Sequence, residues 1–111
     1  MIGGNIEAIL QQKTGSTMNV IGERVQAWSD INHIWGWLDL SSGDSRYTYN
    51  AKIQESTHIF MCDYVDIDRY TDDKRLSVNG NLYDVLLIDD PMELHQHLEI
   101  YLKYLGRDTN G

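Results

Sequence analysis

The sequence is poor in cysteine, proline, basic residues and long apolar runs. Its 111 residues include a single cysteine, Cys62, and a single proline, Pro91. One cysteine excludes an intrachain disulfide and a thiolate metal cluster, and with them a disulfide-stapled secreted mini-domain. The apolar runs are a few residues long, far short of a membrane span. The first residues lack the basic region and the continuous apolar stretch of a signal peptide. We therefore expect one domain over residues 1–111, with no membrane partner.

Basic side chains are the second shortage. Nine Lys and Arg residues stand against seventeen Asp and Glu residues, which gives a formal net charge of −8. Proteins that grip nucleic acid neutralise phosphates with clustered Lys and Arg, so this balance disfavours an ordinary DNA-binding protein. The same deficit disfavours an anionic membrane surface. Hydrophobic residues still make up 41% of the chain, enough for one modest core.

Short runs of strand-forming residues between Gly, Asn and Asp dominate the chain. We predict seven strands, at residues 6–12, 23–28, 32–40, 57–63, 75–78, 81–88 and 95–105. Asn79-Gly80 favours a two-residue hairpin turn. The last segment also has helical leucine spacing, but its alternation is cleaner and predicts a strand. The predicted fold is mainly β, a small antiparallel β-barrel with a long polar loop at 41–56 after the third strand.

Alternation along the third predicted strand separates two faces. One face carries Ile34, Gly36, Leu38 and Leu40, and the other carries His33, Trp35, Trp37 and Asp39. The second face is therefore either another buried side or an assembly surface. With Trp28 and seven tyrosines, these tryptophans could also form a carbohydrate or nucleobase platform, but core and interface packing are commoner uses.

Candidate metal ligands lack a supporting pattern. The acidic cluster comprises Asp63, Asp66, Asp68, Asp72 and Asp73. It has neither the central glycine nor the ligand spacing of a calcium-binding loop, so we expect a solvated loop or a partner-facing edge. On a strand, His95 and His97 would share one face, but two histidines without further ligands are typical of surface or interface positions. We expect no metal.

The candidate nucleophile, Cys62, lies in the apolar run 59–62. A reactive thiol needs a polarising base and partial exposure, so we expect a buried and inert cysteine. The sequence holds no Gly-x-Ser-x-Gly, His-Glu-x-x-His or phosphate-binding loop. We therefore expect a protein that is not an enzyme and has no cofactor.

Several weak motifs occur in a specific order. They are IEAIL (6–10), QAW (26–28), IWGWLDLSSG (34–43), IQES (53–56), STHIFM (56–61), NGNLYDVLLID (79–89) and HLEIYL (97–102). This order resembles that of the head-closure, or stopper, proteins, the head–tail joining family of long-tailed, siphovirus-type phages. The resemblance runs almost from end to end of the chain.

The resemblance implies a virion protein that is made in the host cytoplasm and sits at the head–tail junction. Copies would form a homo-oligomeric ring, dodecameric in the family, with the portal or adaptor ring on the head side. The tail terminator or tail tube would bind on the tail side. Genomic DNA would pass through the lumen without sequence-specific binding, and an acidic ring would keep the duplex centred by repulsion.

The resemblance also implies that the loop at 41–56 projects into the channel, closes it after packaging and retains the DNA. The channel-facing residues would be Ser42, Gly43, Asp44, Arg46, Tyr47, Thr48, Tyr49 and Lys52. Arg46 and Lys52 would be the charges closest to DNA. As assembly contacts we propose Trp35 and Trp37, or Asp66 and Asp68 in the acidic loop.

Two other classes remain open from the sequence. A tail-terminator or tail-completion protein is also a small, acidic, ring-forming domain. A monomeric barrel that binds a small ligand through its tryptophans is the third class, and it predicts a saturable site.

Overall fold

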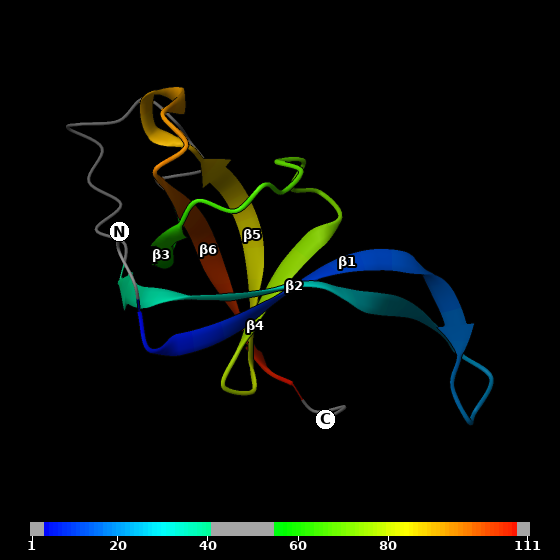
Figure 1. Ribbon diagram of the computed structural model, residues 1–111. Coiled ribbons are helices and arrows are strands. Elements are labelled where there is room, and N and C mark those ends of the chain that lie inside the picture. Colours follow the sequence, from blue (N-terminus) through cyan, green and yellow to red (C-terminus); the bar gives the residue numbers. More distant parts are fainter. Residues whose placement is uncertain (1–3, 41–54, 109–111) are drawn as a thin grey trace.

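The computed structural model describes residues 4–40 and 55–108. Six antiparallel strands in this part of the chain form a closed barrel in the order β1-β2-β3-β6-β5-β4 (Figure 1). They are β1 (Ile6–Met18), β2 (Arg24–Leu40), β3 (His58–Asp63), β4 (Lys74–Val78), β5 (Asn81–Asp89) and β6 (His97–Arg107). A 3₁₀ turn, η2 (Pro91–Glu93), connects β5 to β6. The predicted fold class, mainly β with a small antiparallel barrel, is confirmed.

The prediction of separate strands at 23–28 and 32–40 was wrong, because both belong to the continuous strand β2. In the β1–β2 ladder Leu10 pairs with Asn32, whereas the next residue, Gln11, pairs with Asp30. Ile31 is therefore an extra residue, a β-bulge, which bends the strand without ending it. The extra residue breaks the alternation of apolar and polar residues between the two predicted segments, so one strand looks like two in the sequence. The barrel therefore has six strands rather than seven.

Strand β1 is also longer than predicted. Residues 13–16 were expected to close the first strand, but they continue it, with Gly15 at φ +117° beside a second register shift. The reversal comes later, at Asn19. Its side-chain carbonyl accepts hydrogen bonds from the backbone N–H groups of Ile21 (3.1 Å) and Glu23 (2.9 Å). An asparagine that bonds to following backbone groups is a common turn signal.

The late hairpin and the final strand agree with the sequence-based predictions. Val78 pairs with Asn81, and the two residues between them, Asn79 and Gly80, have φ values of 52° and 81°. Two positive φ angles give the twist that joins adjacent antiparallel strands. The C-terminal segment is strand β6, and it alternates as expected.

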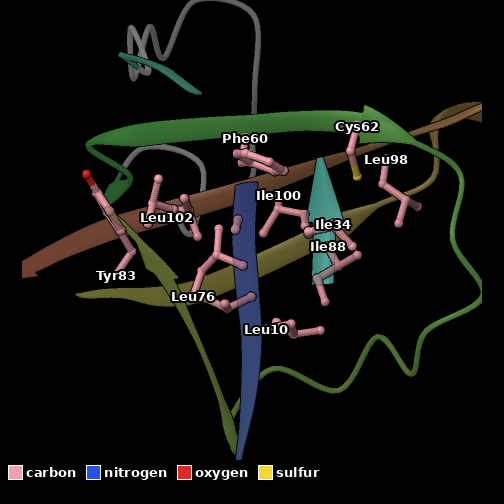
Figure 2. Packing of buried hydrophobic residues seen from close by; sticks show 13 residues of the cluster. Leu10, Ile34, Phe60, Cys62, Leu76, Tyr83, Ile88, Leu98, Ile100 and Leu102 are labelled. Atoms are coloured by element: carbon pink, nitrogen blue, oxygen red, sulfur yellow. The ribbon is translucent and has the colours of Figure 1, made fainter. Parts of the chain in front are cut away.

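The interior of the barrel is filled by apolar side chains from all six strands (Figure 2). The buried cluster comprises Ala8, Leu10, Ile34, Phe60, Cys62, Leu76, Val78, Tyr83, Val85, Ile88, Leu98, Ile100 and Leu102. Fully burying one large apolar side chain contributes about 1.5–3 kcal/mol, so this cluster is the main source of the barrel's stability.

A glycine lets β2 and β3 approach closely. A Cβ atom on Gly36 would lie 2.1 Å from the carbonyl oxygen of Met61 and 2.9 Å from the ring of Phe60. Any side chain there would push the strands apart or displace the Phe60 ring. In the Trp-Gly-Trp sequence at 35–37, the central position faces the inside of the barrel and has to be glycine. The two tryptophans beside it face the outside.

Among the described residues, no helix has the length and apolar character needed to cross a membrane.

Candidate assembly surfaces

Two tryptophans lie on the outer surface of the barrel. Trp35 is 55% exposed and Trp37 is 45% exposed, whereas Gly36 between them is buried. The β-sheet register extends this surface across β2, β3 and β6, because Trp37 pairs with Met61 and Met61 pairs with Glu99. We define the aromatic face as Trp35, Trp37, Ile59, Met61, Glu99 and Tyr101. The predicted alternation is confirmed, and these tryptophans face outward rather than forming a second buried side.

The aromatic face is bordered by acids and histidines. Glu7 pairs with Trp35, Asp39 pairs with Ile59, and Asp89 pairs with Glu99. His33 lies 3.4 Å from the Glu7 carboxylate, and the Nε2 of His97 lies 3.1 Å from the Glu99 carboxylate. Burial raises the pKa of Asp89, and the nearby Glu99 raises it further. Acidic side chains therefore border the aromatic face on β1, β2 and β5.

A second surface is a ribbon that leaves the barrel. We call residues 13–28 the arm; they comprise the last part of β1, the turn and the first part of β2. Within the described chain, β1 pairs with β4 only from Ala8 to Gln12 and β2 pairs with β3 only from Gly36 to Leu40. The arm is therefore a two-stranded extension, visible on the right of Figure 1. Its tip carries four exposed apolar residues, Met18, Val20, Ile21 and Val25.

The root of the arm is braced by stacking and hydrogen bonds. The Arg75 guanidinium lies 4.2 Å from the centre of the Trp28 ring, and the Lys13 ammonium lies 5.8 Å from it. The Nε of Arg75 also donates to the Gln11 side chain at 2.6 Å. A cation over an indole ring contributes about 0.5–2 kcal/mol. No local sequence pattern predicts this contact, because Trp28 and Arg75 are far apart in the chain.

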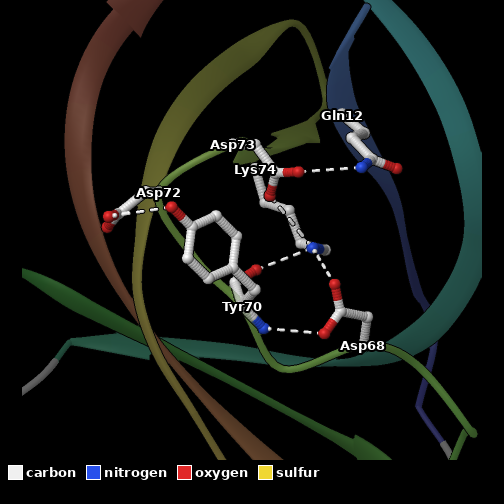
Figure 3. A network of polar contacts seen from close by, with 6 residues as sticks. All are labelled: Gln12, Asp68, Tyr70, Asp72, Asp73 and Lys74. Atoms are coloured by element: carbon white, nitrogen blue, oxygen red, sulfur yellow. Dashed lines mark hydrogen bonds and ion pairs between the residues drawn. The ribbon is translucent and has the colours of Figure 1, made fainter.

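The acidic loop between β3 and β4 is organised by a buried lysine (Figure 3). Lys74 is 2% exposed, and its ammonium donates to the Tyr70 carbonyl (2.6 Å), Asp73 (3.1 Å) and Asp68 (3.2 Å). Asp73 also accepts from Gln12 at 2.8 Å, which ties the loop to β1. A buried charge requires such partners. Lys74 was not singled out from the sequence, although a lysine within a run of acids at a strand start was the available signal.

The Lys74 network changes the interpretation of the acidic cluster, which the sequence predicted to be a solvated loop or a partner-facing edge. Hydrogen bonds from the Tyr70 backbone and from Lys74 lower the pKa of Asp68, and the bond from Lys74 lowers the pKa of Asp73. Both carboxylates therefore stabilise the folded loop through these hydrogen bonds. Of the two predicted assembly acids, Asp68 has this internal role, whereas Asp66 is exposed and interacts with Tyr64.

The prediction that His95 and His97 share one strand face was wrong. Only His97 belongs to β6, because His95 lies in the β5–β6 connection at φ +55°. His95 bonds to the buried Asp90 carboxylate and stacks on Tyr64 with ring centres 4.6 Å apart. Burial alone would raise the pKa of Asp90, but the hydrogen bonds from His95 outweigh that effect and lower it.

Three side chains at this corner could offer ligand atoms to a cation. Atoms of Asp90, Glu93 and His95 all lie within 4.8 Å of one another. However, both Glu93 oxygens accept hydrogen bonds from Arg69 at 2.9 Å, and His95 bonds to Asp90. The corner is internally satisfied, and it fastens the acidic loop to the β5–β6 connection.

Cys62 agrees with its prediction. It is 1% exposed on the inner side of β3, and burial raises its pKa to about 11. A thiol with that pKa is almost entirely protonated near neutral pH, so it is a poor nucleophile.

The predicted channel residues Ser42, Gly43, Asp44, Arg46, Tyr47, Thr48, Tyr49 and Lys52 lie outside the described residues. Their attachment points are described. Leu40 ends β2 and pairs with His58 at the start of β3, so the segment leaves and re-enters the barrel at neighbouring positions. The arm lies at the opposite end of β2.

These features define a class of protein. A small barrel with a filled interior, an exposed aromatic outer face and a protruding apolar arm has the surfaces of an assembly subunit. Residues 6–103 match the family model of the phage head completion proteins, and the chain belongs to this family. The resemblance inferred from the sequence is confirmed, and the family gives the chain a structural role in closing the phage head within the virion.

One solved structure has a similar fold. It is the solution structure of protein SF1141 from Shigella flexneri 2a, with a TM-score of 0.63 and 17% sequence identity. The match covers 94% of this chain and 95% of that one. No curated protein matches the sequence.

Proposed function

We propose that copies of this chain form a ring at the head–tail junction, close the DNA channel after packaging and provide the surface to which the tail attaches. The observation that carries this proposal is the position of the apolar surface. The interior of the barrel is filled by its own core, and the tryptophans point outward. Neither DNA nor a ligand can pass through such a subunit, so a channel has to be formed between copies.

The charge of the chain supports a channel that DNA slides through. Each phosphate neutralised by Lys or Arg strengthens binding through counterion release, so a basic lumen would hold the genome back. A net charge of −8 on each copy gives the opposite effect, because a ring of such copies repels the duplex from its wall. Retention is then steric, and it requires a segment that crosses the lumen.

We assign retention to the segment between β2 and β3, residues 42–52, which includes Arg46 and Lys52. A ring repeats each gate and each intersubunit contact once per copy, twelve times in the dodecamer expected from the resemblance. The outer surfaces of the barrel then serve the portal or adaptor ring on one side and the tail terminator or tail tube on the other. The exposed carboxylate of Asp66 is the acidic-loop candidate for such a contact.

Deleting residues 42–52 tests the gate. Because Leu40 pairs with His58, a shortened connection still joins β2 to β3 as a hairpin, and the barrel is retained. Particles with this deletion should assemble but lose packaged DNA, measured as the ratio of DNA-filled to empty heads after purification. Full retention of DNA would contradict the assignment.

Replacing Arg46 and Lys52 with glutamine is the matched control. It removes the two positive charges but keeps the length of the segment. Steric retention predicts filled heads for this variant, whereas leakage as severe as that of the deletion would indicate that charge holds the DNA.

A further inference from the structure

The tip of the arm is an apolar surface on an extension that the barrel does not cover. Met18 is 64% exposed, Val20 fully exposed, Ile21 73% exposed and Val25 40% exposed. Thr17 pairs with Val25 and Met18 pairs with Arg24, so Val25 and Met18 lie on opposite faces of the ribbon. Contiguous exposed apolar residues mark contact surfaces, and a two-stranded ribbon gains stability when it packs on another surface.

The charge of the arm differs from that of the rest of the chain. Residues 13–28 contain Lys13, Arg24 and one acid, Glu23, so the arm has a formal charge of +1. The remaining chain has seven basic and sixteen acidic residues, a formal charge of −9. The arm of one copy is therefore attracted to the barrel of another copy.

Among the described residues, the charged positions that pair in register with the aromatic face are acidic, and Lys103 lies two residues beyond Tyr101 on β6. Across β1, β2, β3, β6 and β5, the outward residues that pair in register with the aromatic face include Glu7, Asp39 and Asp89, in addition to Glu99 itself. Like charges opposite each other on adjacent strands are destabilising, as for Asp89 and Glu99. Burial and Glu99 also raise the pKa of Tyr101 to about 12. A cation placed at this face relieves that repulsion.

The arm cannot reach the aromatic face of its own barrel. Strand β2 runs without a break from Arg24 in the arm to Trp35 and Trp37 in the face. Folding the arm back would require β2 to reverse on itself and to lose its ladder with β1. The acceptor therefore has to be a second molecule.

We propose that the arm tip of one copy packs on the aromatic face of the next copy, with Arg24 beside the acids that border the face. This inference rests on the proposed ring. The two surfaces are different, so the contact is head-to-tail, and repeating it around an axis closes a ring. The aromatic rings and the apolar tip form the dry centre of the contact, and the charges form its rim.

Disulfide trapping between two full-length variants tests this contact. Thr17→Cys places a thiol on the exposed part of the arm without changing its apolar residues. His33→Cys places a second thiol beside Trp35 on the same side of β2. The native Cys62 is buried, so it does not compete. The control partner is Leu82→Cys on β5, the strand that lies opposite β2 in the closed strand order.

We expect the Thr17→Cys and His33→Cys copies to form a mixed disulfide about tenfold faster than the control pair, because docking raises the effective thiol concentration. Adding Arg24→Glu to the arm-bearing copy should slow trapping several-fold at low salt and less at high salt. Equal rates for both pairs would overturn the inference.

The Thr17→Cys variant with a photoactivatable crosslinker attached to that thiol, incorporated into assembled particles, separates this inference from the proposed function. A cross-link to a second copy supports the arm contact, whereas a cross-link only to a portal, adaptor or tail protein overturns it. Neither result changes the location of the chain. Absence of the chain from the head–tail junction in a reconstruction would overturn the proposed function, even if two isolated copies formed the arm contact.

Discussion

The barrel and the arm share strands β1 and β2 but are held together in different ways. In the barrel, each ladder has neighbours on both sides and the inner side chains are buried. In the arm, each strand pairs only with the other, and the apolar residues at the tip are exposed. The barrel is therefore stable by itself, whereas the arm has a surface that is suited to another molecule. Changes in the two regions should have different consequences.

Removing the largest fully buried side chain should have the greatest effect on stability. Phe60 is fully buried, and Phe60→Ala should lower the free energy of unfolding by about 3–5 kcal/mol because it removes apolar contacts and leaves a cavity. Urea denaturation measures this change. Val20→Ala at the arm tip is the matched control, and it should change the stability by no more than about 0.5 kcal/mol. Similar losses in both variants would show that the arm belongs to the cooperative core.

Replacing the buried lysine should have an intermediate effect. Lys74→Met removes the ammonium donor from the Tyr70 carbonyl and from the Asp68 and Asp73 carboxylates, which should cost about 1–3 kcal/mol near neutral pH. The pKa values of Asp68 and Asp73 are lowered in the folded protein. Their contribution is therefore present above the ordinary aspartate pKa and is lost as the pH falls through the lowered values.

The acid dependence sharpens this prediction. The stability difference between the wild type and Lys74→Met should be largest near neutral pH and should narrow as the pH falls below about 4. Urea midpoints measured from pH 7 to pH 2 would show it. A difference that stays constant over this range would mean that Lys74 acts through its packing rather than through its charge.

Loosening the arm at its root should have the smallest effect. Trp28→Ala removes the ring that stacks under Arg75, and it should destabilise the arm locally by about 1 kcal/mol. Hydrogen exchange should then be about fivefold faster for amides in the arm, with little change in β5 and β6. Trp28→Phe retains a ring and should give an intermediate rate. Equal acceleration throughout the barrel would show that the arm and barrel open together.

Local signals in the sequence predicted much of the fold. The Asn79-Gly80 turn, the alternation in β6 and the alternation that separates Trp35 and Trp37 from Ile34 and Gly36 are set by neighbouring residues, and each prediction is confirmed. The errors came from bulges. An extra residue at Ile31 interrupts the alternation of β2, and Gly15 reads as a turn although it lies inside β1. The β1–β2 ladder continues past both irregularities. Which residues pair between two strands cannot be deduced from the sequence of one strand.

The candidate site was only partly predictable for a similar reason. Period-two alternation predicted that Trp35 and Trp37 share one face of the strand, but it left open whether that face is exposed. The stacking of Arg75 on Trp28 joins residues from distant strands, so no local pattern indicates it. The role of Lys74 depends on the closure of the barrel, which buries its ammonium among the carboxylates of the acidic loop. His95 was misplaced because the predicted strand began at residue 95, whereas β6 begins at His97 and His95 still belongs to a connection in which Met92, Glu93 and His95 have positive φ angles.

Reconstruction of assembled particles by cryo-electron microscopy tests most directly the proposal that this chain closes the head as a ring at the junction with the tail. The proposed function predicts a closed ring of copies between the portal or adaptor and the tail, with residues 42–52 of each copy directed into the lumen. Copies found only within the tail, or a single copy without a ring, would contradict it.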